Sequence, residues 1–230
     1  VSMYCYTSCD NNSSDDVKAC RGVVYDNTTH NVVCKALPYS NTYSVSEYDF
    51  GSVDFENCDI FDSIEGTLIR VFNHKDKWYK TTHHKLDANT SYWSSRTSFG
   101  KMFDEAIGDI DVLYGKMDKS SIYMFIVENN KENRIVCNAS DDPQVYHVCT
   151  MSDGKINFDD DIGVQKPNRC NAKNSCDLNR YVDDIDIYRN QGVIIFKSDG
   201  TQDKVYNDIY NEMMNIRGNE QSIRFRYLQL

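Results

Sequence analysis

Short apolar runs separated by polar turns dominate the chain, and most of them predict paired strands. The runs 21–26 and 31–37 flank a polar turn, and so do 67–72 and 77–83. Residues 191–206 hold two further runs around an Asp-Gly turn. Runs of this length with such turns are typical of β-hairpins. A further series, 121–129, 133–139 and 144–151, predicts a three-stranded meander.

Helical spacing occurs in two segments. Residues 97–111 carry apolar side chains at 99, 102, 103, 106, 107 and 110, which is the spacing of one helical face. Residues 206–218 are amphipathic and end at Gly218, a residue suited to a helix C-terminus. Residues 152–180 are rich in Asp, Asn and Lys and predict a loop or a small insertion. The pattern therefore predicts an α+β fold, dominated by antiparallel sheet, in a single domain of residues 1–230.

The net charge of the chain argues against one class of function. The chain of 230 residues has a net charge of −10, which argues against a general nucleic-acid coat, because such proteins rely on Lys and Arg. Segments 75–85 and 217–226 are locally basic and predict either a basic groove or two solvated faces. In the second segment Arg224 and Arg226 alternate with aromatic residues as on a strand, so we expect an RNA-facing strand or an edge strand paired with acids.

Nine cysteines stand at 5, 9, 20, 34, 58, 137, 149, 170 and 176, several of them in apolar runs. This usage favours reduced, buried thiols and a cytoplasmic protein; disulfides between Cys5 and Cys9 or between Cys170 and Cys176 are the alternative. The spacing lacks the paired ligands of a zinc site. No apolar run approaches the roughly 18 residues of a membrane span, so no membrane partner is expected.

One stretch, "SIEGTLIRVF" at 63–72, points to specific chemistry when it is combined with four others. These are "ACRGVVYD" (19–26), "KWYKTTHHKLDA" (77–88), "YMFIVENNKENRIV" (123–136) and "NQGVIIFKSDGTQDKVYNDIY" (190–210). In this order they resemble the nucleotidyltransferase motifs of the phage-type RNA ligase family. The resemblance implies two antiparallel sheets with a nucleotide cleft between them and a few flanking helices. DNA ligases and mRNA capping enzymes are similar in fold.

Enzymes of that family attack the α-phosphorus of ATP with a lysine amine and hold a metal ion on acidic groups. At the lysine position of the Lys-x-Asp-Gly motif this chain has Ser63, followed by Glu65 and Gly66. The acid expected before Gly192 is Gln191, and of the final lysine pair only Lys204 is present, with Tyr206 at the second position. The changes concentrate on catalytic positions while framework residues persist. The resemblance therefore implies a fold that no longer forms the covalent lysine–nucleotide adduct.

Three hypotheses follow. The first is a non-enzymatic protein of viral origin that binds a nucleotide or an RNA 5′ end, including a capped end, in the host cytoplasm. No cofactor is certain, and ATP or GTP is the expected ligand. The second is a divergent RNA ligase or guanylyltransferase that uses an unrecognised lysine; Lys85 in "HHKLDA" is a weaker match to the lysine motif. The third is a protein-interaction module with a vestigial cleft and a protein partner.

We assign no catalytic residue and no metal ligand. Trp78, Tyr79 and Trp93 are expected either to stack on a base or to pack in the core, and His83 and His84 either to bind the ligand or to lie on the surface. The expected nucleotide- or RNA-binding residues are Arg21, Ser63, Glu65, Gly66, His83, Arg134, Gln191 and Lys204.

Overall fold

The computed structural model describes residues 1–93, 96–138, 140–218, 220 and 222–229. Two compact units are built from interleaved segments of the chain. Unit 1 comprises Val1–Leu37, Gly66–Asn133 and Ser140–Lys166, and unit 2 comprises Pro38–Glu65, Arg134–Ala139 and Pro167–Leu230. Each unit is described separately below, and the single domain expected from the sequence stays a prediction.

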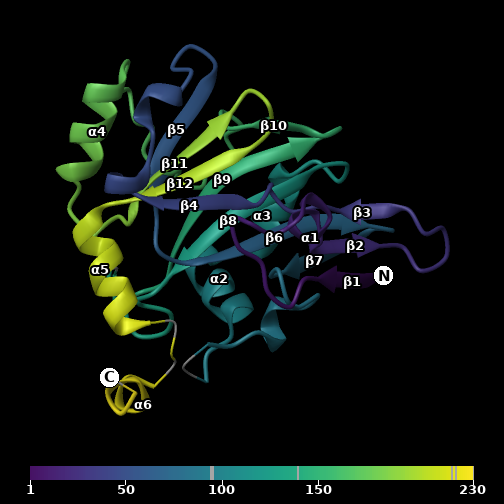
Figure 1. The fold of residues 1–230 in the computed structure, drawn as a ribbon. Coiled ribbons are helices and arrows are strands. Elements are labelled where there is room, and N and C mark those ends of the chain that lie inside the picture. The colour runs from purple at the N-terminus through teal and green to yellow at the C-terminus, as the bar shows by residue number, and fades with distance from the viewer. Residues whose placement is uncertain (94–95, 139, 219, 221, 230) are drawn as a thin grey trace. The chain divides into compact units, whose positions relative to one another are not determined.

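Unit 1 contains two antiparallel sheets (Figure 1). The larger has the order β10-β9-β8-β6-β7 and the smaller the order β1-β2-β3. Their strands are β1 (Ser2–Cys5), β2 (Arg21–Tyr25), β3 (Val32–Cys34), β6 (Thr67–His74), β7 (Lys77–Thr81), β8 (Ile122–Glu128), β9 (Gln144–Ser152) and β10 (Lys155–Asn157). Its helical elements are α1 (Asp15–Ala19), the 3₁₀ turn η3 (Ala88–Thr90), α2 (Phe99–Ile107) and α3 (Ile110–Lys116). The hairpins predicted at 21–37 and 67–83 are confirmed.

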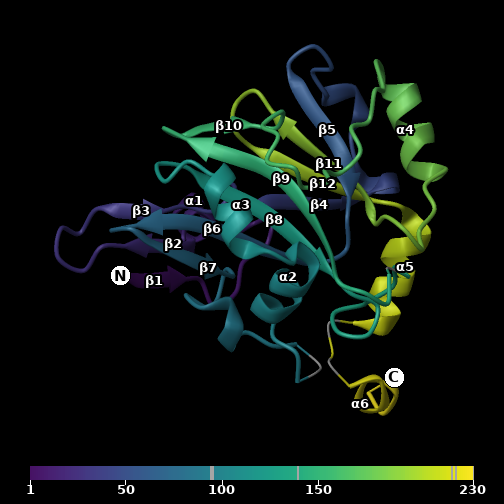
Figure 2. The ribbon, with the colours of Figure 1, turned by 180° about the vertical axis from the view of Figure 1, so that it is seen from behind.

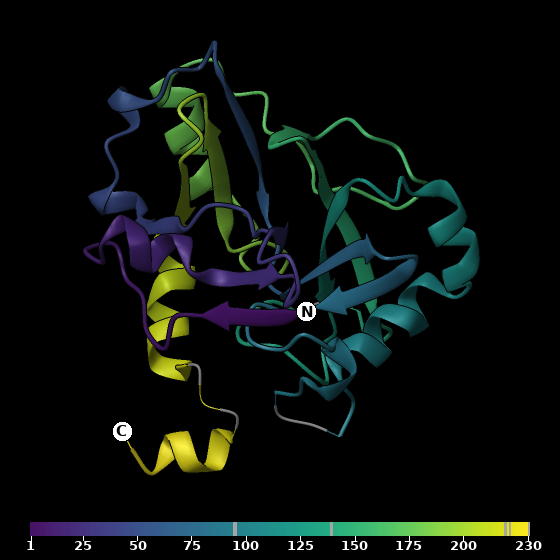
Figure 3. The same cartoon turned by 90° about the vertical axis from the view of Figure 1, so that its right-hand side faces the viewer.

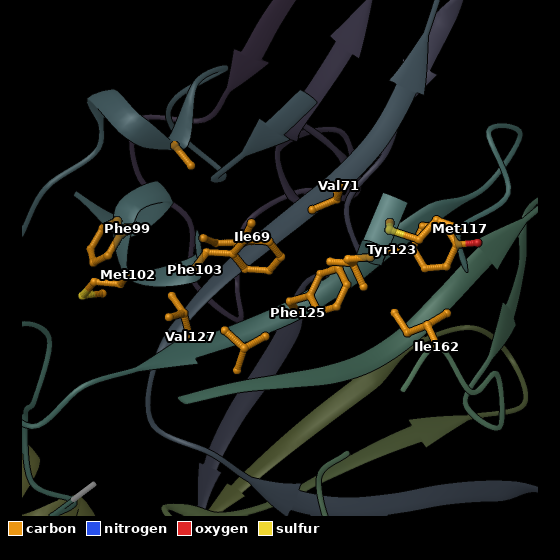
Figure 4. Packing of buried hydrophobic residues seen from close by; sticks show 13 residues of the cluster. Ile69, Val71, Phe99, Met102, Phe103, Met117, Tyr123, Phe125, Val127 and Ile162 are labelled. Atoms are coloured by element: carbon orange, nitrogen blue, oxygen red, sulfur yellow. The ribbon is translucent and has the colours of Figure 1, made fainter. Parts of the chain in front are cut away.

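Helices α2 and α3 cover one face of the larger sheet (Figure 2). The aromatic rings of Phe103 on α2 and Phe125 on β8 meet edge to face, with centroids 5.1 Å apart (Figure 4). Ile69, Val71 and Met102 are fully buried in the same cluster. The helix expected over 97–111 is divided, because Gly108 ends α2 at φ 78° and the Asp109 carboxylate then caps α3. Apolar spacing alone did not reveal this break.

Unit 2 contains a four-stranded sheet of order β4-β12-β11-β5. Its strands are β4 (Ser40–Ser44), β5 (Cys58–Ser63), β11 (Gly192–Lys197) and β12 (Gln202–Tyr206). Its helical elements are η1 (Val45–Glu47), η2 (Phe50–Ser52), α4 (Ser175–Asp183), α5 (Asp208–Arg217) and α6 (Ile223–Tyr227). The hairpin predicted at 191–206 is confirmed, and α5 ends at Gly218 as expected. The α+β fold with antiparallel sheets is also confirmed, with one parallel pair, β4 with β12.

Two local predictions from the sequence are wrong. Residues 133–138 form no strand, so β8 pairs directly with β9; position 139 lies outside the described residues. The expected C-terminal strand is helix α6, whose first turn is capped by the Ser222 hydroxyl; positions 219, 221 and 230 lie outside the described residues. All nine cysteines are free thiols, as the sequence favoured, and neither alternative disulfide is formed. Residues 152–180 include β10 and the start of α4.

The two tryptophans contact the core of unit 1, as their packing alternative predicted. Trp78 stacks on Tyr114 with ring centroids 4.8 Å apart, and Trp93 packs against the same hydrophobic cluster. Tyr79 stacks on Phe72 at 5.3 Å. Within the described part of the chain, no helix has the length and apolar character needed to cross a bilayer.

A buried histidine in unit 1 predicts a pH-dependent stability. His147 is fully buried on β9 against the rings of Tyr123 and Phe125. Its Nε2 lies 3.1 Å from the Thr150 hydroxyl, which in turn donates to the Asp160 carboxylate at 2.5 Å. Burial, and secondarily the charge of Lys166, lowers the pKa of His147 to about 4. The imidazole is therefore neutral in the folded protein at pH 7.

Since an unfolded histidine titrates near pH 6.5, the unfolded chain binds more protons than the folded one between about pH 6.5 and 4. The stabilisation is present above this window and is lost as the pH falls through it, by up to about 3 kcal/mol. Urea unfolding at several pH values should show this loss, and His147→Gln should flatten it. Equal pH slopes for the two proteins would contradict the assignment.

Candidate functional site

A hydrogen-bonded network in unit 2 joins four of the residues expected from the sequence: Ser63, Gln191, Lys204 and, through one further side chain, Glu65. Ser63 ends β5, Gln191 precedes β11 and Lys204 lies on β12. The antiparallel register places Gly192 opposite Ser63, and Ile194 opposite Lys204. The Ser63 hydroxyl donates to Gln191 Oε1 at 3.1 Å, and the Lys204 ammonium donates to the same oxygen at 2.8 Å. Ser63 and Gln191 are buried, while Lys204 is half-buried.

The network continues to a residue that the sequence did not indicate. Gln191 Nε2 donates to the hydroxyl of Tyr210 on α5 at 2.7 Å, and that hydroxyl donates to Glu65 Oε2 at 2.9 Å. Burial and the neighbouring Glu65 carboxylate raise the pKa of Tyr210 above its ordinary range, so its proton stays on the phenol. In the sequence, only the i, i+4 spacing of Tyr206 and Tyr210 could have indicated that Tyr210 belongs to the network. The same spacing is typical of core residues on a helix, so it did not distinguish the two roles.

The Glu65 carboxylate accepts four hydrogen bonds. Besides Tyr210, its donors are the backbone amides of Ile135 at 2.5 Å, Val136 at 2.9 Å and Cys137 at 3.1 Å. These amides belong to the segment predicted as a strand, and their bonds to a carboxylate explain why no strand forms there. Arg134, which precedes them, is exposed. Glu65 therefore joins three chain segments of unit 2.

Polar groups near Ser63 fit a metal ion poorly. Ser63, Gln191 and Tyr210 are neutral, Lys204 is cationic, and the Glu65 oxygens already accept four donors. Hard divalent cations prefer carboxylate oxygens. Within the described residues, no group of three or more His, Cys, Asp or Glu side chains is arranged to hold a metal ion.

Three expected residues lie in unit 1. Arg21 begins β2 and is half-buried; its guanidinium lies 3.5 Å from the Leu37 carbonyl. Gly66 precedes β6, where a Cβ would lie 2.6 Å from the Val127 carbonyl oxygen, so a side chain there would collide with backbone. His83 is half-buried and its Nε2 is buried. Burial, followed by the charges of Arg21 and Arg70, holds the pKa of His83 well below its usual value.

A buried arginine beside these residues was not indicated by the sequence, because it lies within the apolar run 67–72. Arg70 on β6 is fully buried and donates to the carbonyls of Gly22 at 2.6 Å and Thr82 at 2.9 Å. Gly22, at φ 68°, leaves no room for a Cβ between Arg70 and the His83 backbone. Unit 1 thus gathers Arg21, Arg70 and His83, whereas His84 is exposed, as its surface alternative predicted.

Comparison with known proteins identifies viral relatives. The chain is 30% identical over 245 residues to the immediate-early protein ICP-46 homolog of Invertebrate iridescent virus 3, covering 97% of this chain and 53% of that protein. It is 33% identical over 241 residues to the corresponding homolog of Invertebrate iridescent virus 6, covering 91% and 52%. The ICP-46 protein of Frog virus 3 is 26% identical over 226 residues, covering 86% and 56%. The chain therefore spans about half the length of these relatives.

Solved structures with a similar fold are RNA ligases of Naegleria gruberi. A variant with AMP and Mn matches with a TM-score of 0.53 at 9% identity, over 75% of this chain and 56% of the ligase. A variant without ligand matches with a TM-score of 0.52 at 9% identity, over 69% and 52%. No protein-family model matches the chain. The chain shares the fold of these ligases; a nucleotide cleft between its sheets stays a prediction.

Proposed function

Starting from the nucleotidyltransferase fold, we propose that this protein binds a nucleotide or an RNA 5′ end and no longer forms a covalent lysine–nucleotide adduct. One observation supports the proposal: the Ser63 hydroxyl, at the position where the resemblance places the nucleophilic lysine, is held by a neutral carboxamide, Gln191. A lysine–nucleotide adduct requires an amine at that point, which serine lacks. The viral relatives support a viral origin, and residence in the host cytoplasm is part of the proposal.

Lys204 is the proposed phosphate contact of unit 2. Its ammonium has three donors, one of which is directed to Gln191, and a half-buried cation binds phosphate more strongly than a solvated one. Arg21, with its partial exposure, is the proposed contact of unit 1. Without a metal ion, a few cations would carry most of the phosphate affinity, so binding would weaken with salt.

Calorimetric titration with ATP, GTP and a capped dinucleotide, each with and without EDTA, tests the proposal. We expect saturable binding of at least one ligand that EDTA does not change. Lys204→Ala should weaken it about tenfold, the scale of a charge-assisted hydrogen bond. Lys173→Ala, which removes an exposed lysine of the same unit, should leave it unchanged. Absence of heat with all three ligands would reject nucleotide binding and favour a protein-interaction module.

A second candidate, a divergent enzyme, rests on the amine of Lys204. This amine shares the Gln191 oxygen with Ser63, so it lies within the same network as the nucleophile position. Incubation with α-labelled ATP or GTP and Mg²⁺ or Mn²⁺, followed by a denaturing gel, separates the two candidates. We expect no label on the protein; a label that Lys204→Ala abolishes would establish the enzyme.

A further inference from the structure

A cavity of about 790 Å³ lies on the β1–β2 pair of unit 1. Its floor comes from one face of the two strands, where Ser2 pairs with Tyr25 and Tyr4 with Val23. Met3 and Val24, on the opposite face, pack into a hydrophobic cluster. One wall is α1 with Asp16, together with Cys20 that follows it, and the other is the turn 26–30. Figure 3 shows the backbones of β1 and β2 side by side, in purple. The volume is in the range of small-ligand sites.

The floor offers aromatic faces to solvent. Tyr4 and Tyr25 meet edge to face, with ring centroids 5.7 Å apart and planes at 75°. Tyr4 remains 56% exposed although it lies on a strand. The negative face of an aromatic ring attracts cations, and a planar guanidinium also stacks on it. The two rings therefore favour a flat cationic group.

The charged side chains that line the cavity also favour a cationic ligand. Its lining includes two carboxylates, Asp16 and Asp26, and neither Lys nor Arg. Asp26 is bound by His74 at 2.7 Å and by Lys75 at 2.8 Å, whereas Asp16 is exposed at the rim. Among the described residues, no Lys or Arg side chain lines the cavity to bind a phosphate, while a guanidinium can stack on tyrosine and donate two hydrogen bonds to a carboxylate such as Asp16.

We propose that this cavity binds an arginine side chain presented by a protein partner. Its lining includes Ser2, Tyr4, Asp16, Cys20, Val23, Tyr25 and His30. The guanidinium would stack on Tyr4 and donate to Asp16. Arginine fits better than lysine, because the compact ammonium neither stacks nor forms a fork of donors. A methylated cap base also carries a cationic ring, but its phosphates would face the negative rim. This site is independent of the nucleotide function proposed above.

Nuclear magnetic resonance titration of the 230-residue chain with acetyl-Gly-Arg-Gly-amide tests the proposal. We expect saturable shifts at the amides of Tyr4, Cys20 and Tyr25, and weaker binding of the lysine peptide. Tyr4→Ala and Asp16→Asn should each weaken the arginine peptide about tenfold, the scale of a stacked, paired cation. Asp153→Asn, which removes an exposed acid elsewhere in unit 1, should change its affinity less than about twofold.

Unchanged amide signals away from the cavity would verify that Tyr4→Ala and Asp16→Asn fold. We expect both variants to fold, because both side chains are exposed. Shifts spread over the acidic surface, or an affinity of Tyr4→Ala and Asp16→Asn equal to that of the unmodified chain, would overturn the proposal. So would tighter binding of a capped dinucleotide than of the arginine peptide at the same amides.

Discussion

Replacing Glu65 by alanine should lower the free energy of unfolding of unit 2 by about 4 kcal/mol. The substitution leaves three backbone amides and the Tyr210 hydroxyl without their acceptor. Buried donors without a partner cost roughly 1–3 kcal/mol each, and relaxation of the segment after residue 134 recovers part of the sum. Urea unfolding, together with hydrogen exchange at the amides of 135–137, measures the loss.

Two further variants serve as comparisons for Glu65→Ala. Tyr210→Phe removes one of the four donors to Glu65 and should cost about 1–2 kcal/mol, because it also leaves the Gln191 amide without its acceptor. Glu56→Ala removes an exposed carboxylate of the same unit and should stay within about 0.5 kcal/mol of the unmodified protein. A loss below about 1 kcal/mol for Glu65→Ala would show that the network contributes little.

Gly192→Ala should destabilise unit 2 by a similar amount, about 4 kcal/mol, for a steric reason. Gly192 has φ 149°, and an added Cβ would stand 2.0 Å from the Val205 carbonyl oxygen on β12. Its strand β11 lies between β5 and β12, so the backbone cannot move without breaking one ladder. The cost combines backbone strain with a collision, each worth about 1–3 kcal/mol. Thermal unfolding measures it.

Gly200→Ala provides the matched control in the turn between the same two strands. Gly200 also has a positive φ, 82°, but an added Cβ meets no atom within 4 Å. Its cost should therefore be the backbone term alone, about 1–2 kcal/mol. If both variants were equally destabilised, the close approach at Val205 would not be the cause.

Predictions from the sequence succeeded where a structure is local. The 191–206 hairpin and the end of α5 at Gly218 follow from turn and cap residues within a few positions. Segment 133–139 was misassigned because Glu65, some seventy positions earlier in the chain, accepts from the amides of 135–137, and apolar spacing holds no information about such an acceptor. Helix α6 was missed because a five-residue helix is too short to show a period.

The convergence of Ser63, Gln191 and Lys204 followed from a resemblance to known motifs rather than from the residues alone. Strand register then explains it, because β11 pairs with both β5 and β12. Tyr210 belongs to the network around Glu65, and Arg70 lies with Arg21 and His83. Neither residue was predicted, because Tyr210 stands in a pattern typical of a core helix and Arg70 in one typical of a core strand. Whether the eight expected residues bind a ligand stays a prediction.

The shared oxygen of Gln191 also bears on evolutionary reversibility. A lysine introduced alone at position 63 would bring a second ammonium toward Lys204, with only an uncharged carboxamide between them. A glutamate introduced alone at position 191 would bury an acid that only Lys204 neutralises. The two positions are thus coupled: a lysine at position 63 would be better tolerated once position 191 carries a carboxylate, so we expect changes at 63 and 191 to occur together in related sequences.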